Sequence, residues 1–242
     1  MKTNETTKVY DFKTYNENIR EALKTKSSLT LEGVCGQRYI GSAMKKGKKL
    51  VLKGIPGNDL GCYMDGGEIE VIGNAQDAIG NTMNDGKITV HGNCGDTAGY
   101  AMRGGQILIK GNGGTRIGIH MKEYMDKVPE IVLGGKSGDF LGEYMAGGTV
   151  LVLGIGTNEL CGRFAGTGMH GGRILLRGEF DKELISDKLA IEPASEDDMV
   201  IIRRLVGDYC KAFGCEEDLL KSKFTKVYAL DKRPYGNMYV GC

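Results

Sequence analysis

Tryptophan is absent from the 242 residues, and proline (4) and histidine (3) are rare. The scarcity of proline separates this chain from disordered Pro/Gly-rich linkers, although 39 of its residues are glycine. A formal net charge of +1 argues against a strongly basic nucleic-acid binder and against an acidic interaction tail. No apolar run is long enough to span a membrane, and the N-terminal residues lack the apolar stretch of a signal peptide. We therefore expect a cytoplasmic protein that binds neither nucleic acid nor membrane.

The sequence contains few patterns typical of catalytic, metal-binding or nucleotide-binding sites. The seven cysteines are widely spaced and form no CxxC pair, so reduced thiols are expected. The closest pair, Cys210 and Cys215, has no further Cys or His beside it that would complete a metal site. The dinucleotide-like pattern GTGMHG at 166–171 lacks the helix that should follow it. The three histidines occupy different positions of the repeat described below (His91, His120 and His170). The sequence thus predicts no catalytic, cofactor-binding or metal-binding residue.

The glycines follow a repeat of 19 residues. Each unit contains a glycine, a methionine three residues later, and a second glycine followed by alternating apolar residues and a closing glycine. Seven units span residues 41–178, two of them with five-residue insertions and the first with one extra residue. Apolar residues that alternate with period two indicate a strand with one buried face. Because such strands can stack on their equivalents in the next unit, we predict a mainly β protein, a parallel β-helix of about seven coils.

Equivalent positions of the units form columns with distinct chemistry. One column holds seven of the 11 methionines, and we expect these thioethers to fill the interior rather than to bind copper. A second column is always small and indicates a tight corner (Ala75, Cys94, Gly113, Ser137 and Cys161). Four aspartates lie at turns beside glycine or asparagine, where local Asx-turn hydrogen bonds are expected (Asp59, Asp77, Asp96 and Asp139).

The strand residue between the two inward ones changes character along the chain. This outer column is polar at Glu70 and Thr89 and apolar afterwards. Its apolar part should be covered, either by the C-terminal segment of the chain or by a partner. The predicted cap or partner interface consists of Leu108, Val132, Leu151 and Leu175.

Helical segments flank the repeat. Thr14-x-x-Glu17 matches a capping box and predicts a helix to about Lys26, after which SLTLEGV reads as a strand. Ser195-x-x-Asp198 predicts a second helix that ends at Gly214. A short helix near EEDLLKS and a strand, FTKVYAL, follow; helix and strand together should cover the outer column. We expect one structural domain with a helical arm (1–30), a β-helix (31–180) and a helical cap with a terminal strand (181–242).

The repeat units resemble a known domain. GNAQDAIGNTMNDGKITVHGN (73–93), GYAMRGGQILIKG (99–111) and GEYMAGGTVLVLG (142–154) are similar to the C-terminal glycine-repeat (GXGXG) domain of the glutamate synthase large chain. The similarity extends from about residue 31 to residue 235 and includes the tail helix and strand. It implies a right-handed parallel β-helix without catalytic residues of its own, which holds the enzyme's other domains in place.

We expect the domain to stand alone here, since the 242 residues contain no glutaminase or flavin-domain sequence. The resemblance therefore implies a non-catalytic scaffold subunit of a glutamate synthase-like complex in glutamate biosynthesis. Its partners would be a glutaminase subunit and a synthase subunit that carries FMN and Fe–S clusters, with no cofactor in this chain. A homo-oligomer is compatible with this interpretation. Two alternatives stay open: a β-helix subunit related to the one in formylmethanofuran dehydrogenase that has a similar repeat, and an independent binding module or enzyme.

Overall fold

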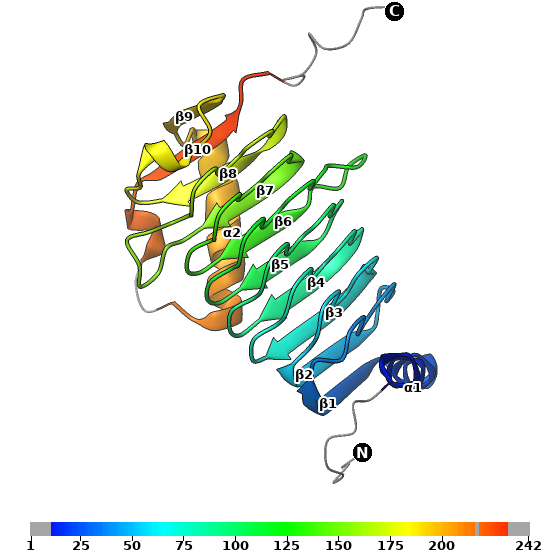
Figure 1. The fold of residues 1–242 in the computed structure, drawn as a ribbon. Helices are drawn as coiled ribbons and strands as arrows, with labels where there is room; N and C mark the ends of the chain where they lie inside the picture. Colours follow the sequence, from blue (N-terminus) through cyan, green and yellow to red (C-terminus); the bar gives the residue numbers. More distant parts are fainter. Residues whose placement is uncertain (1–10, 216–217, 232–242) are drawn as a thin grey trace, which may run out of the picture.

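The computed structural model describes residues 11–215 and 218–231 (Figure 1). Most of the chain forms one stack of strands, with a helix at its N-terminal end and a second helix along one face. In chain order the elements are α1 (Phe12–Thr25), β1 (Ser28–Cys35), β2 (Lys49–Ile55), β3 (Asp65–Ile72), β4 (Asp85–Val90), β5 (Gln106–Ile109), β6 (Glu130–Leu133), β7 (Ala146–Val152), β8 (Gly171–Arg177), the 3-10 helix η1 (Lys182–Leu184), β9 (Leu189–Pro193), α2 (Glu196–Phe213), the 3-10 helix η2 (Leu219–Lys221) and β10 (Phe224–Ala229).

Strands β1 to β8 pair in parallel in sequence order, each one turn above the last. The register advances by one repeat unit, since Ile69 pairs with Ile88, and Ile88 pairs with Ile107. The five-residue insertion before β6 is absorbed outside the strands, because Ile107 still pairs with Ile131. The predicted β-solenoid of about seven turns is thus confirmed, and β1 adds a strand before the first repeat. At the far end β10 pairs antiparallel with both β8 and β9, which completes a ten-stranded sheet.

The interior is filled by the predicted columns. The inward strand residues are buried, and so are all seven methionines of the repeat, from Met44 to Met169. The small column is also buried, with Ala75 bridged to Cys94 in the next turn. Burial raises the pKa of the Cys94 thiol to about 12 and that of Cys161 to about 11, so both thiols stay protonated and act as packing groups.

Asparagine side chains connect successive turns at one corner. The Oδ1 atoms of Asn74 and Asn93 each accept a hydrogen bond at 2.8 Å from the backbone N–H 19 residues further on. A Cβ at Gly111 would lie 2.2 Å from Asn93 Oδ1, closer than any real contact. Gly92 and Gly111 are therefore required as glycines, because the asparagine of the previous turn occupies the side-chain space of each.

Aspartates form a second ladder of the same kind, which corrects the expectation of local Asx-turns. Asp77 Oδ1 accepts from Asp96 N–H at 3.0 Å, and Asp96 Oδ1 accepts from Thr115 N–H at 2.8 Å. Asp139 reaches the next turn in the same way, at Arg163 N–H. In a solenoid the backbone N–H group one turn above lies within reach of each carboxylate. These aspartates therefore link successive solenoid turns instead of forming local Asx-turn hydrogen bonds.

Of the two capping boxes predicted from the sequence, one is confirmed and the other is wrong. The capping box at Ser195 and Asp198 is confirmed for α2, and Gly214 is its C-cap with φ +78°. The capping box at Thr14 is wrong, because the N-cap of α1 is Asp11, whose carboxylate accepts from Lys13 N–H. Thr14 instead donates its hydroxyl to the same carboxylate. The helix consequently begins one turn earlier than predicted.

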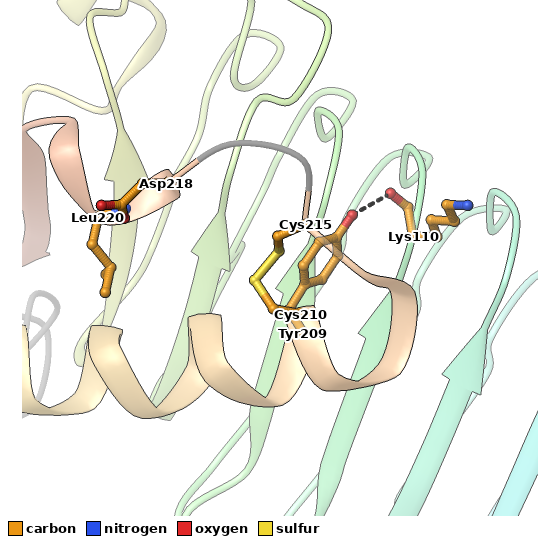
Figure 2. The surroundings of a disulfide bond; sticks show 6 residues. All are labelled: Lys110, Tyr209, Cys210, Cys215, Asp218 and Leu220. Carbon is orange, nitrogen blue, oxygen red and sulfur yellow. Dashed lines mark hydrogen bonds between the residues drawn. A yellow bond between two sulfur atoms is a disulfide. The ribbon is translucent and has the colours of Figure 1, made fainter.

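Cys210 and Cys215 form a disulfide, so the prediction of reduced thiols is wrong for this pair (Figure 2). The reversal at Gly214 brings the chain back on itself at the end of α2, and the two Cα atoms lie 5.1 Å apart. Cys35 is a free exposed thiol and Cys62 a free buried one, while Cys242 lies outside the described residues.

Candidate assembly surface

The apolar part of the outer column lies beneath α2. Leu108, Val132, Leu151 and Leu175 are fully buried, although they point away from the solenoid interior. Figure 1 shows α2 running beside the strands from β5 to β8. Both helix and terminal strand contribute to the cover. The buried residues that complete this second core are Ile202, Leu205, Val206 and Tyr209 of α2, with Leu153, Leu219 and Phe224. The four predicted interface residues are therefore covered by the protein's own C-terminal cap.

Polar contacts hold the middle and the C-terminal end of α2 on the sheet. Glu130, with a side chain only 11% exposed, accepts from both terminal nitrogens of the Arg204 guanidinium. Gln106 donates to Asp208 at 2.9 Å. The hydroxyl of Tyr209 donates to the backbone oxygen of Lys110 at 2.9 Å (Figure 2). Burial raises the pKa of this tyrosine to about 12, so it remains a hydrogen-bond donor.

Asp198 fixes the N-terminal end of α2. Its side chain is 3% exposed and accepts from the N–H and the hydroxyl of Ser195 at 3.0 and 2.6 Å. Arg173 of β8 and Lys226 of β10 reach it at 3.0 and 3.1 Å. Burial alone would raise the pKa of Asp198, but the Ser195 hydrogen bonds and the Lys226 ammonium outweigh it and lower the pKa to about 2. The cap is thus anchored along its length.

The cap ends where the outer column becomes polar. Phe213, the last residue of α2, contacts the ring of His91 edge-on at 5.2 Å. Beyond it Glu70 pairs with His91 and with Lys49, each at 3.2 Å. The change from leucine to glutamate and threonine in the sequence therefore marks the edge of the cover.

The histidines of the described residues lie in separate places and do not form one site. His120 lies between two tyrosine rings, and His170 Nδ1 lies 3.1 Å from the backbone oxygen of Gly168. Within residues 11–215 and 218–231, no three His, Cys, Asp or Glu side chains are placed to hold a metal ion. Over the same residues, no helix is long and apolar enough to cross a membrane.

Aromatic residues gather at one solenoid corner, which was not predicted from the sequence. In each turn the residues two before and two after the corner glycine adopt positive φ, for example Phe140 and Tyr144 around Gly142. In the later turns these positions stack from one turn to the next. We define the aromatic corner as these stacked groups together with Tyr100: Tyr100, His120 and Tyr144 on one side and Arg116, Phe140 and Phe164 on the other. Aromatic residues recurring 24 residues apart beside a repeat glycine were the signal in the sequence.

A cavity of about 560 Å³ lies at the C-terminal end of the stack. It is lined by the last corner, including Phe164 and Met169, and by the segment from Glu183 to Leu189. Leu230 and Asp231 complete its wall. The cavity therefore adjoins one end of the aromatic corner, through Phe164.

Comparisons with known proteins agree with this architecture. The protein MJ1350 of Methanocaldococcus jannaschii is 44% identical over 241 residues, which cover 94% of this chain and 92% of that protein. A chain in the crystal structure of the formyltransferase/hydrolase complex of Methylorubrum extorquens, solved with methylofuran, has a similar fold with a TM-score of 0.62. That match is 23% identical and covers 83% of this chain and 72% of the other. The family model described as the GXGXG motif matches residues 5–230. The chain belongs to the GXGXG motif family.

Proposed function

We propose that this chain is a non-catalytic assembly subunit of a glutamate synthase-like complex. In this role it holds a glutaminase subunit and a synthase subunit that carries FMN and Fe–S clusters. The chemistry, formation of two glutamates from glutamine and 2-oxoglutarate, belongs to those partners. This chain contributes a rigid surface on which they are placed.

One observation carries the proposal: the segment after the repeat is folded onto the solenoid as an integral cap. The four apolar residues of the outer column are buried under α2, and β10 extends the sheet beyond β8. The sequence similarity to the glutamate synthase domain includes this tail, and the tail is the reason for preferring glutamate synthase to formylmethanofuran dehydrogenase. A β-helix closed by its own cap is stable without being fused to the other domains, as a separate subunit requires.

The experiment is affinity purification of the tagged full-length chain from the cells that produce it. We expect co-recovery of subunits with flavin and Fe–S absorbance, and glutamine-dependent formation of glutamate from 2-oxoglutarate by the recovered complex. Recovery of the chain by itself would contradict the assembly role. Turnover by the isolated chain would favour an independent enzyme.

A formyl-transferring complex is the second candidate, favoured by one observation. The similar fold in the Methylorubrum extorquens structure belongs to a formyltransferase/hydrolase complex. In that case the chain would be an assembly subunit related to the β-helix subunit of formylmethanofuran dehydrogenase. Recovery of molybdenum- or tungsten-containing partners in the same purification, without glutamate formation, would select this candidate over the first.

A further inference from the structure

We propose that the aromatic corner is the surface on which a partner protein docks, and that the partner presents apolar side chains flanked by carboxylates. This inference rests on the proposed assembly role and identifies the part of the rod that performs it. The covered outer column is not available for that purpose, because α2 already occupies it.

The rings of the aromatic corner are ordered by stacking and yet remain exposed. Tyr144 and His120 stack face to face with ring centroids 5.3 Å apart, and Phe140 and Phe164 stack at 5.2 Å. Despite this stacking, Phe164 is 52% exposed and Tyr144 is 37% exposed. Large aromatic rings left half in water, in register over several turns, mark an interaction site more often than an ordinary surface.

The backbone conformation at these positions is unfavourable for aromatic residues. Phe140, Tyr144 and Phe164 have φ of +59°, +51° and +62°, a region that bulky side chains occupy only at a cost and that asparagine or glycine occupies more readily. The corner itself does not need aromatic residues. Equivalent positions in the middle turns hold Ala78, Thr82, Thr97 and Ala101, with the same positive φ. Tyr39 and Tyr63 occupy such positions in the first turns, but rings stacked from turn to turn occur in the later ones, and this combination of strain and stacking points to a role beyond the fold.

The charges around the rings determine the kind of partner. Arg116 lies over the Phe140 ring at 4.9 Å, and Arg163, whose side chain is 72% exposed, lies over the Phe164 ring at 5.9 Å. Each arginine has an acid beside it, and Asp139, 35% exposed, lies 3.8 Å from Arg163. Glu143 is 12% exposed and accepts from Arg116 Nε, and Asp139 accepts from a backbone N–H. Arg163 is the most exposed of these four charged side chains, so the surface offered to a partner is aromatic with an exposed guanidinium, and its complement is apolar and acidic.

The test compares three variants of the tagged full-length chain in the purification described above. Phe140→Asn combined with Phe164→Asn removes both rings and places a residue that tolerates positive φ, so the fold is retained. Tyr63→Asn is the control for replacing an exposed aromatic residue at positive φ, since Tyr63 occupies the Tyr144 position of an early turn, has φ of +56° and is 56% exposed. Arg163→Glu reverses the exposed charge without altering the corner rings.

We expect the double variant and Arg163→Glu each to lower recovery of the flavin- and Fe–S-bearing partners by about tenfold or more, as for loss of an interface hot spot. Tyr63→Asn should match the wild type within about twofold, a change below the size of a hot-spot effect. Identity and amount of the partners are measured by quantitative mass spectrometry, and thermal unfolding verifies that each variant is folded.

The outcomes separate the two proposals. If the wild type, the double variant and Arg163→Glu all recover these partners in equal amounts, the docking surface is wrong and the assembly role still stands. No recovery by the wild type overturns the assembly role and this inference with it. If sedimentation shows a wild-type homodimer that the double variant abolishes, the corner binds a second copy, and the inference of an acidic heterologous partner is wrong.

Discussion

Corner side chains join neighbouring turns one hydrogen bond at a time. Asn93 accepts from the N–H of Asn112, while its own N–H donates to Asn74, so each asparagine links two turns. The same residues explain two glycines one turn later, because Asn74 fills the Cβ space of Gly92 and Asn93 fills that of Gly111. The recurring Gly-Asn pair is therefore a packing unit shared by two turns, not a flexible break in the chain.

This pairing can be tested by a double-mutant cycle. We expect Gly111→Ala to lower the free energy of unfolding by about 1–3 kcal/mol through overpacking against Asn93 Oδ1. In the Asn93→Ala background the same change should cost clearly less, because the next atom, Gly92 O, is 3.2 Å from the added Cβ. Urea unfolding of the four proteins measures both values. Equal costs in the two backgrounds would show that the asparagine does not exclude a side chain at position 111.

Asp198 gives a pH dependence with a defined sign. Its pKa in the folded protein is about 2, below the ordinary value of 3.8, so the carboxylate stabilises the fold above pH 4 and that contribution is lost as the pH falls toward 2. The difference corresponds to about 2 kcal/mol. Between pH 4 and pH 2 the wild type should lose about that much more unfolding free energy than Asp198→Asn. If the unfolding free energies of the two proteins fall in parallel between pH 4 and pH 2, the Asp198 carboxylate does not stabilise the fold in this way.

At the scale of elements, α2 adds a second core outside the solenoid. Leu151 of β7 is fully buried beneath it, whereas Thr89 of β4, in the same outer column, lies beyond the cover and is only half-buried. The two positions therefore form a natural comparison between covered and uncovered parts of one column.

We expect Leu151→Ala to destabilise the protein by about 2–5 kcal/mol, as for other buried leucines. Thr89→Ala should cost less than about 1 kcal/mol, since it removes little buried surface. Unfolding free energies from denaturant titration give both values. A similar small loss at both positions would mean that α2 is not seated on the outer column in solution.

The helices and strands also show how much of the fold can be predicted from one sequence. The 19-residue period was enough to predict the strands, their stacking and the cover over Leu108 to Leu175, because register follows directly from a strict repeat. The start of α1 was missed, since Asp11 and Thr14 both suit an N-cap and the structure selects Asp11, whose carboxylate accepts from Lys13 N–H. The disulfide was missed because it depends on the reversal at Gly214 rather than on spacing.

The candidate docking surface was the least predictable feature. Its aromatic residues are 20 to 24 positions apart in the sequence, and the signal that relates them is their recurrence beside the repeat glycines. They become neighbours only when the turns stack, and their positive φ values are a property of the folded corner. The outer column, by contrast, was visible in the sequence because burial leaves a direct hydrophobic signature.

The whole molecule is a rod with one face closed by its own helix and, in our proposal, one corner open to a partner. The solenoid core and the cap supply stability, while the later turns supply the exposed aromatic and cationic groups. A protein built this way is expected to occur as a bound subunit.

Native mass spectrometry of the protein purified from the cells that produce it tests this claim most directly. We expect the 26.2 kDa chain to be found mainly in a heteromeric assembly whose remaining mass corresponds to larger, flavin- and Fe–S-bearing subunits. A spectrum that contains only the free chain, or only multiples of its mass, would contradict the assembly role.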